Sequence, residues 1–374
     1  MVVEEEEKAP PLHGDLLETI LSHVSLFDLM PASHVSKAWQ RAVASSVLDP
    51  ARTKPWLILH LQSTRNPTAT TAHAYDPHLR VWVKMLHVTT SHTCHLRASN
   101  SNHLHMISPS KLSLSWDALN GVWTSLGAPK VWRQDPIVAM VGSHVVVAAG
   151  TCEFEDDPLA VEVLDPKSGK WAACEPMPTI FKSSASASWL SVAASDHKMY
   201  VLEKSSGEFC SFNLNTMKWE RPSELRPEPS LFFSSIAFAR DRLILFGLAG
   251  DANNVTSLRL WEVNCDTLEH KEIGKMPAGM VGRLIKDADS PLSSIGVALA
   301  GDFAYVYNPS DPKEIFYCDF STRICEWGSI QNTIVSDQNR LDRFIFTCSN
   351  VTMDDIKAIS RAKSGKFMNN LAVK

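Results

Sequence analysis

The spacing of apolar residues divides the chain into a short helical part and a long part built from strands. Near the N-terminus, apolar side chains recur every three to four residues at Leu16, Leu17, Ile20, Leu21 and Val24. This spacing predicts a helix with one apolar stripe. Val35, Trp39 and Val43 follow at intervals of four and predict a second helix. After residue 54 the helical period disappears, and short alternating or apolar runs predict strands instead.

The sequence also predicts where the first helices begin and end. Asp15 is a suitable N-cap, and Glu18 stands three residues later in the position of a capping box. Leu26 and Leu29 continue the apolar stripe until Pro31, which we expect to break the chain.

A helical unit of roughly 40 residues is too small to bury this much apolar surface by itself. Two interpretations follow from the pattern alone. The helices could cap the following domain, or they could present a docking surface for the helices of a partner protein.

The strand-rich part contains a repeat marked by tryptophan. Trp82, Trp123, Trp171 and Trp219 each follow an Asp or Asn by six residues, in segments such as VLDPKSGKW and SFNLNTMKW. A fifth copy keeps Asn264 but has His270 in place of Trp, and a longer sixth copy ends at Trp327. A period near 50 residues is typical of the blades of a kelch-type propeller.

Each copy has an apolar strand upstream of its turn. The Asp or Asn segment predicts a tight turn, after which the Trp opens the outer strand and fills the gap between neighbouring blades. The fold predicted is therefore mainly β, with six blades. RFIFTCSNV at 343–351 is a spare strand that could close the ring with the first blade. The upstream strands are WLILHL (56–61), HLHMIS (103–108), VVVAAG (145–150), MYVLEK (199–204), LILFGLAG (243–250) and FAYVYN (303–308).

Charge and composition argue against several classes of partner. The formal net charge is −5, so no overall positive field favours nucleic acid or an anionic membrane. No apolar run approaches the roughly 18–20 residues of a membrane span. The acidic start MVVEEEEK lacks the layout of a signal peptide, and the eight scattered cysteines suggest reduced thiols. We expect a protein of the cytoplasm or nucleus, without nucleic-acid or membrane partners.

Few residues suggest chemistry. His92, Cys94, His95, His103 and His105 are zinc-capable, but their spacing fits no common structural site. We expect no metal there, no cofactor, and neither a bridge nor a metal at Cys318 and Cys325. We interpret the acidic segment EFEDD at 153–157 as a solvated loop or as a contact for a basic patch on a partner. Hydrolase and phosphate-loop motifs are missing, and no catalytic residues are predicted.

The segment LHGDLLETILSHVSLFDLMPASHVSKAWQRAV resembles an F-box, the helical module that binds the Skp-type adaptor of SCF ubiquitin ligases. It departs from the usual Leu-Pro opening, because His13 follows Leu12. The resemblance implies an adaptor-binding surface, and through the adaptor a cullin and a RING subunit. The residues it assigns to adaptor binding are Leu12, Leu16, Ile20, Leu21, Val24, Leu29, Val35 and Trp39.

The remainder resembles the kelch repeats of plant F-box/kelch proteins, although the usual Gly-Gly is degraded to AAGT (148–151) and GLAG (247–250) or lost. The expected organisation is an acidic flexible N-terminus at 1–11, an F-box at 12–50, a propeller at 54–352 and a tail at 353–374. The resemblance implies a non-catalytic substrate receptor that holds a protein for ubiquitination and proteasomal degradation. Some relatives of this kind target enzymes of phenylpropanoid and flavonoid metabolism.

Two other functions stay open, namely a kelch scaffold whose helices only cap the propeller, and a propeller enzyme. For the receptor, specificity would lie in loops at one propeller face. Exposed aromatic and basic side chains dominate interface energetics, so we take as candidate substrate-binding residues Lys130, Trp132, Arg133, Phe181, Phe232 and Arg283.

Overall fold

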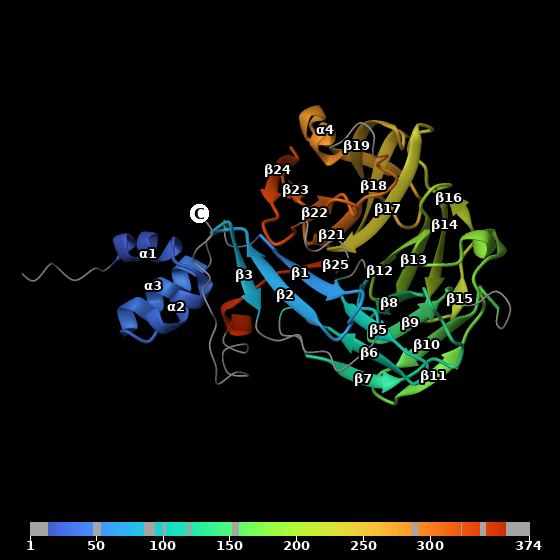
Figure 1. Cartoon of the computed structure of the whole chain (residues 1–374), viewed down its shortest axis with the longest axis horizontal. Helices are drawn as coiled ribbons and strands as arrows, with labels where there is room; N and C mark the ends of the chain where they lie inside the picture. Colours follow the sequence, from blue (N-terminus) through green and yellow to red (C-terminus); the bar gives the residue numbers. More distant parts are fainter. Residues whose placement is uncertain are drawn as a thin grey trace, which may run out of the picture.

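The structure is a computed structural model of the chain and consists of three short helices followed by a six-bladed β-propeller (Figure 1). It describes residues 14–47, 54–85, 94–99, 102–116, 119, 122–151, 157–285, 291–322, 324–336 and 342–356. The predicted acidic segment at 1–11 lies outside these residues. Within the described part, no helix is long and apolar enough to cross a membrane.

The predicted mainly β fold is confirmed. Each blade is an antiparallel sheet in which the strands follow one another from the axis outwards. The innermost to outermost strands of the first three blades are β25 (Asp342–Ser349), β1 (Trp56–Ser63), β2 (Thr70–Asp76) and β3 (Val81–Met85) in blade 1; β4 (Arg97–Ala98), β5 (Leu104–Ile107), β6 (Lys111–Ser115) and β7 (Thr124–Gly127) in blade 2; and β8 (Ile137–Val141), β9 (His144–Ala148), β10 (Val161–Asp165) and β11 (Lys170–Ala173) in blade 3.

The other three blades repeat this order, and β16 (Ser223–Glu224) adds a short fifth strand to blade 4 beside β14. A 3-10 helix, η2 (Thr179–Ser184), precedes blade 4, and α4 (Ala278–Ile285) precedes blade 6. The strands are β12 (Leu190–Ala194), β13 (Lys198–Glu203), β14 (Glu208–Asn213) and β15 (Lys218–Trp219) in blade 4; β17 (Leu231–Ala239), β18 (Arg242–Asp251), β19 (Asn254–Val263) and β20 (His270–Lys275) in blade 5; and β21 (Gly296–Ala300), β22 (Phe303–Tyr307), β23 (Glu314–Asp319) and β24 (Glu326–Gln331) in blade 6.

The last strand closes the ring as predicted. β25 pairs with β1 along its whole length, from Asp342 opposite Ser63 to Ser349 opposite Trp56. Blade 1 therefore contains strands from both ends of the propeller sequence. Because this pairing joins segments almost 300 residues apart, the ring cannot open without losing a ladder of backbone hydrogen bonds. After β25, residues 353–356 form one helical turn.

The Asp or Asn of each repeat builds the same turn between the third and fourth strands. In blade 3, Oδ1 of Asp165 accepts a hydrogen bond from the backbone N–H of Lys167 at 2.9 Å. Four residues after the Asp, Gly169 adopts a φ of 67° and leads into the outer strand. Asp76, Asn213, Asn264 and Asp319 accept the equivalent bond. These are Asx turns, in which the side chain replaces a backbone acceptor. Asp117 lies outside the described residues.

The repeat tryptophans lie in the seams between blades, on or beside the outermost strands. Trp171 of β11 packs against a cluster that joins Leu112 and Leu114 of the preceding blade 2 to blade 3, and its indole nitrogen donates to the carbonyl oxygen of Gly127 at 2.9 Å. Trp82 and Trp219 make the corresponding bonds to Gln331 and Glu175. The predicted gap-filling role is therefore confirmed for these three residues.

All five repeat tryptophans are half-buried, and none of them belongs to the fully buried core. The reason is their position on or beside the outermost strands, at the rim of the ring, where neighbouring blades cover each side chain only in part. The deepest packing instead comes from the second and third strands of each blade, for example Val146, Val201 and Phe246.

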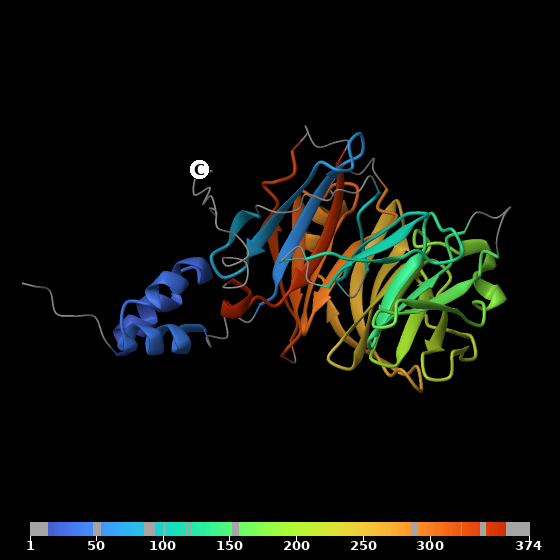
Figure 2. The same cartoon turned by 90° about the horizontal axis from the view of Figure 1, so that it is seen from below.

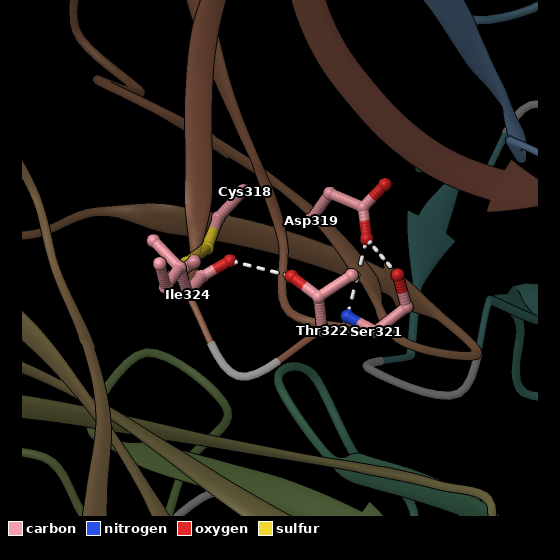
Figure 3. The surroundings of a disulfide bond; sticks show 6 residues. Cys318, Asp319, Ser321, Thr322 and Ile324 are labelled. Carbon is pink, nitrogen blue, oxygen red and sulfur yellow. Dashed lines mark hydrogen bonds between the residues drawn. A yellow bond between two sulfur atoms is a disulfide. The ribbon is translucent and has the colours of Figure 1, made fainter.

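A disulfide joins Cys318 to Cys325 across the turn between β23 and β24 (Figure 3). This corrects the expectation that the cysteines are all free. Antiparallel pairing sets Cys318 opposite Trp327, which brings the Cα atoms of the two cysteines to 6.3 Å, within the range of a disulfide. Inside the turn, Asp319 accepts hydrogen bonds from the N–H and hydroxyl of Ser321. The other described cysteines are free thiols.

Candidate interaction surfaces

The three N-terminal helices form a small unit whose buried side chains join a core shared with the first blades of the propeller. They are α1 (Asp15–Ser22), α2 (Leu26–Ala32) and α3 (Lys37–Val47). Leu17 and Leu21 of α1 are buried together with Leu29 of α2 and Val43 of α3. The single apolar stripe expected for the first helix is therefore divided, since Leu17 and Leu21 face inwards while Leu16 and Ile20 face solvent.

The ends of α1 and α2 differ from those predicted from the sequence. Helix α1 begins at Asp15 itself, its N-cap is Gly14, and no side chain caps it, so the predicted capping box is wrong. Glu18 accepts instead from the hydroxyl of Ser45 on α3 at 2.9 Å. Ser25 caps α2, and Pro31 lies inside its last turn instead of ending the helix before it.

Three large apolar side chains of this unit remain exposed. The exposed fractions are 59% for Leu16, 41% for Ile20 and 62% for Val35. Leu16 and Ile20 are one helical turn apart and so share a face of α1. We call these three residues the exposed apolar set. A unit that covers some of its leucines and leaves others in water has surface available for a partner.

The other predicted adaptor-binding residues are divided by burial. Leu21 and Leu29 are buried in the shared core, so they shape the unit instead of contacting a partner directly. The reason is that each lies on the inward side of its helix. Val24 and Trp39 are half-buried. Leu12 lies outside the described residues.

The helical unit also contacts the propeller, at the base of blade 1 (Figure 2). The ring of Phe27 on α2 packs edge-on against Trp56 at the start of β1, with centroids 5.8 Å apart. Nε2 of His78, in the β2–β3 turn, donates to the carbonyl oxygen of Ser22 at 2.5 Å. We call this contact the junction. It gives the helices a defined position relative to the propeller.

The junction and the inter-blade loops lie at opposite ends of the propeller. Trp56 pairs with Ser349, so β1 starts at the end where the innermost strand β25 finishes. The loops that connect one blade to the next lead into the beginnings of the innermost strands. Since every blade repeats the same inner-to-outer order, those beginnings lie on one face. We call it the loop face.

Glu162 organises the loop before blade 3, which carries three of the predicted substrate-binding residues. The carboxylate of Glu162 accepts from the backbone N–H groups of Lys130 and Val131 at 2.8 and 3.2 Å. Arg133 pairs with the same carboxylate at 3.3 Å and donates to the carbonyl oxygen of Ala149. Arg133 is completely buried, so its assignment to a binding surface is wrong. Lys130 is exposed and Trp132 half-buried.

The other three predicted substrate-binding residues differ in how far they are buried. Phe181 of η2 is completely buried between blades 3 and 4 and cannot contact a substrate. Phe232 is half-buried against the core between blades 5 and 6. Arg283 on α4 is exposed and pairs with Glu314 at 3.1 Å. Sequence reasoning could not distinguish these outcomes, because an apolar residue in a loop can pack inwards or outwards.

Other residues of the loop face were not predicted from the sequence. Trp189, at the start of blade 4, is 58% exposed. Asp135, before β8, accepts from Arg97 and from the N–H and hydroxyl of Ser188. Gly150 has a φ of 72°, and a Cβ there would lie 2.3 Å from the backbone of Asp135, so only glycine permits this close approach.

In the described part of the chain, no three His, Cys, Asp or Glu side chains gather where they could hold a metal ion. His92 lies outside the described residues. His103 packs edge-on against Trp116, and His105 is buried in β5. EFEDD lies almost wholly outside the described residues.

Comparison with known proteins agrees with both parts of the structure. Residues 12–50 match the model of the F-box domain. A curated F-box/kelch-repeat protein of Arabidopsis thaliana is 40% identical over 381 aligned positions, which cover 98% of this chain and 95% of the relative.

Proposed function

Because the chain belongs to the F-box/kelch-repeat proteins, whose general role is that of an F-box substrate receptor, we propose that it is the substrate-recognition subunit of an SCF-type ubiquitin ligase. The F-box would bind a Skp-type adaptor, and through it a cullin and a RING subunit. The propeller would bind the protein to be ubiquitinated. The assembly would operate in the cytoplasm or the nucleus.

The exposed apolar set is the observation that carries this proposal. Leu16, Ile20 and Val35 remain in water although the same helices bury five other large apolar residues against each other and against blade 1. Covering three large apolar side chains with a partner would contribute several kcal/mol, at about 25 cal/mol for each Å² removed from water.

In this role the chain would perform no bond chemistry of its own. Its contribution would be proximity, since holding a substrate lysine beside a ubiquitin-loaded enzyme raises the effective concentration of the lysine. The loop face would be the site of capture. It lies away from the junction, and it carries the exposed Trp189, Lys130 and Arg283. Enzymes of phenylpropanoid and flavonoid metabolism are the first candidates for the captured protein.

The scaffold interpretation is favoured by one observation, the junction itself. Phe27 and His78 show that the helices do cover part of blade 1. The two functions use different faces of the helical unit, so they can be separated by mutation.

The test is a pull-down of the Skp-type adaptor by the full chain. Leu16→Ala with Ile20→Ala should weaken adaptor binding by at least tenfold, while thermal unfolding of the propeller stays unchanged. Ile324→Ala is the matched control, because it truncates an exposed apolar side chain on blade 6 and should leave binding intact. Unchanged adaptor binding by the folded double variant would favour the scaffold.

A further inference from the structure

The centre of the propeller contains a cavity of about 350 Å³ that opens on the loop face. It is lined by the innermost strands, which surround the axis in Figure 1. The apolar part of its lining includes Ile137, Val192, Val297 and Phe346. Its entrance is polar and includes Arg97, Asp135, Lys204 and Arg343. A cavity of this size, lined by both polar and apolar groups, falls within the range of small-molecule sites.

The charges at the entrance do not cancel. Asp135 is the carboxylate among the described lining residues, and both of its oxygens are already engaged, one by Arg97 and the other by Ser188. Lys204 donates to the carbonyl oxygens of Ala187 and Ser188, each at 2.9 Å, and pairs with no described carboxylate.

Arg343 is the second cation without a direct partner, and the charge of Asp135 offsets only part of the effect of burial and of Arg97 on it. In the described part of the chain its guanidinium has no ion-pair or hydrogen-bond partner. Partial burial and the neighbouring charge of Arg97 lower its pKa below the ordinary value. A cation that is held partly out of water beside another cation is stabilised when an anion joins it.

His105 provides an independent sign that the cavity receives a polar ligand. Its side chain is 3% exposed and lines the cavity, and among the described residues neither ring nitrogen has a hydrogen-bond partner. Burial lowers its pKa to about 3, so the ring is neutral and offers one donor and one acceptor. It lies opposite Arg97 in the β4–β5 pair. A buried unpaired imidazole is costly unless a ligand satisfies it.

We propose that this cavity binds a small organic anion with an apolar body, whose carboxylate or phosphate is held by Arg343 and Lys204 and whose body contacts the apolar part of the lining. The imidazole of His105 would bond to a polar group of the ligand. The inference goes beyond the substrate-receptor function and does not depend on it. It would make the propeller responsive to a metabolite that occupies the centre of the loop face.

The experiment titrates the full-length protein with benzoate and with phenyl phosphate, by calorimetry and by thermal shift. Benzamide, which has nearly the same shape without the charge, is the matched ligand control. We expect at least one of the two anions to bind and to raise the melting temperature, and benzamide to bind about tenfold more weakly or less. Equal binding of the amide, or no binding of either anion, would overturn the proposal.

Variants assign the binding to the cavity. Arg343→Gln should weaken anion binding about tenfold, and Lys204→Met provides a second test if the first variant fails to fold. Arg221→Gln removes an exposed charge on blade 4 and should have no effect. Unaltered anion affinity in a folded cavity variant would contradict the proposal.

A further titration uses a short acidic peptide with blocked termini. If only the peptide bound, and lost affinity in the Arg343 variant, the cavity would be a contact for a protein side chain, and the small-molecule proposal would be wrong. Adaptor binding is measured in parallel and should not change, so failure here is distinguishable from failure of the ligase function.

Discussion

The indole nitrogen of Trp171 in blade 3 donates a hydrogen bond to the carbonyl oxygen of Gly127 at the end of blade 2. This bond ties together two outer strands that belong to different sheets. Trp82 and Trp219 make the same connection at two other seams. The repeat tryptophan therefore connects neighbouring blades at the rim of the ring.

Truncating the Trp171 side chain should lower the stability of the protein by less than truncating a fully buried aromatic side chain does. Because Trp171 is half-buried, we expect Trp171→Ala to reduce the free energy of unfolding by about 2 kcal/mol, below the roughly 3–5 kcal/mol typical of core sites. Trp171→Phe keeps most of the packing and loses the hydrogen bond, so about 1 kcal/mol is expected. Urea denaturation of both variants measures the difference. Equal losses would show that the ring contributes nothing beyond its hydrogen bond.

The buried pair of Arg133 and Glu162 offers a sharper stability test. Arg133→Met would leave the Glu162 carboxylate buried without its cation, which typically costs about 3–5 kcal/mol. Arg133→Met combined with Glu162→Gln should cost less than the single change, because no charge is then left unpaired. Arg283→Met is the control, since it breaks an exposed ion pair and should cost less than about 1 kcal/mol. If the double variant were less stable to unfolding than Arg133→Met alone, this account would be contradicted.

The junction should set the orientation of the F-box and not its affinity for the adaptor. Phe27→Ala removes an edge-on aromatic contact worth about 1 kcal/mol beyond its buried area. We expect the variant to bind the adaptor normally but to show a broader distribution of shapes by small-angle scattering. Leu16→Ala is the opposite case and should weaken adaptor binding without changing the scattering. A Phe27 variant with unaltered scattering would show that other contacts are sufficient to hold the helices in place against the propeller.

Acid should destabilise the propeller through its buried histidines. Burial lowers the pKa of His60 to about 4, while the unfolded chain has a value near 6.5. Between these values the unfolded state binds the extra proton, so stability is complete above pH 6.5 and falls as the pH drops towards 4. The expected loss is roughly 1 kcal/mol for each pH unit. His60→Leu should flatten this part of the profile in denaturation curves at several pH values, and an unchanged slope would assign the acid sensitivity to other groups.

The disulfide should contribute stability to blade 6. A bridge that closes a loop this short is worth roughly 2 kcal/mol when it forms without strain. Reduction should therefore lower the melting temperature of the wild type and leave Cys318→Ala unchanged. Gly274 of blade 5 lies close to Cys325, and a Cβ there would come within 3.0 Å of it, so Gly274→Ala should also disturb this seam. If reductant had no effect on the wild type, the bridge would not be formed in solution.

The sequence by itself determined the architecture, because the signals that specify it are local. The side chain of Asn213 makes its turn with residues two and three positions ahead, and Trp219 follows at a fixed distance. Such short-range chemistry repeats with the blades and can be read along the chain. The closing strand was also predictable, since an unpaired apolar strand at the end of a ring has one free edge to join.

Only the tertiary structure decided which side chains face outwards. Arg133 and Phe181 have the composition of a binding surface, yet both are buried, because packing against other blades fixes the direction of a loop side chain. Leu16 and Leu17 are neighbours in sequence, yet Leu16 is exposed and Leu17 is buried. The charge excess in the central cavity is likewise a tertiary property. Arg343 and Lys204 are far apart in sequence, and only closure of the ring brings them to the same entrance.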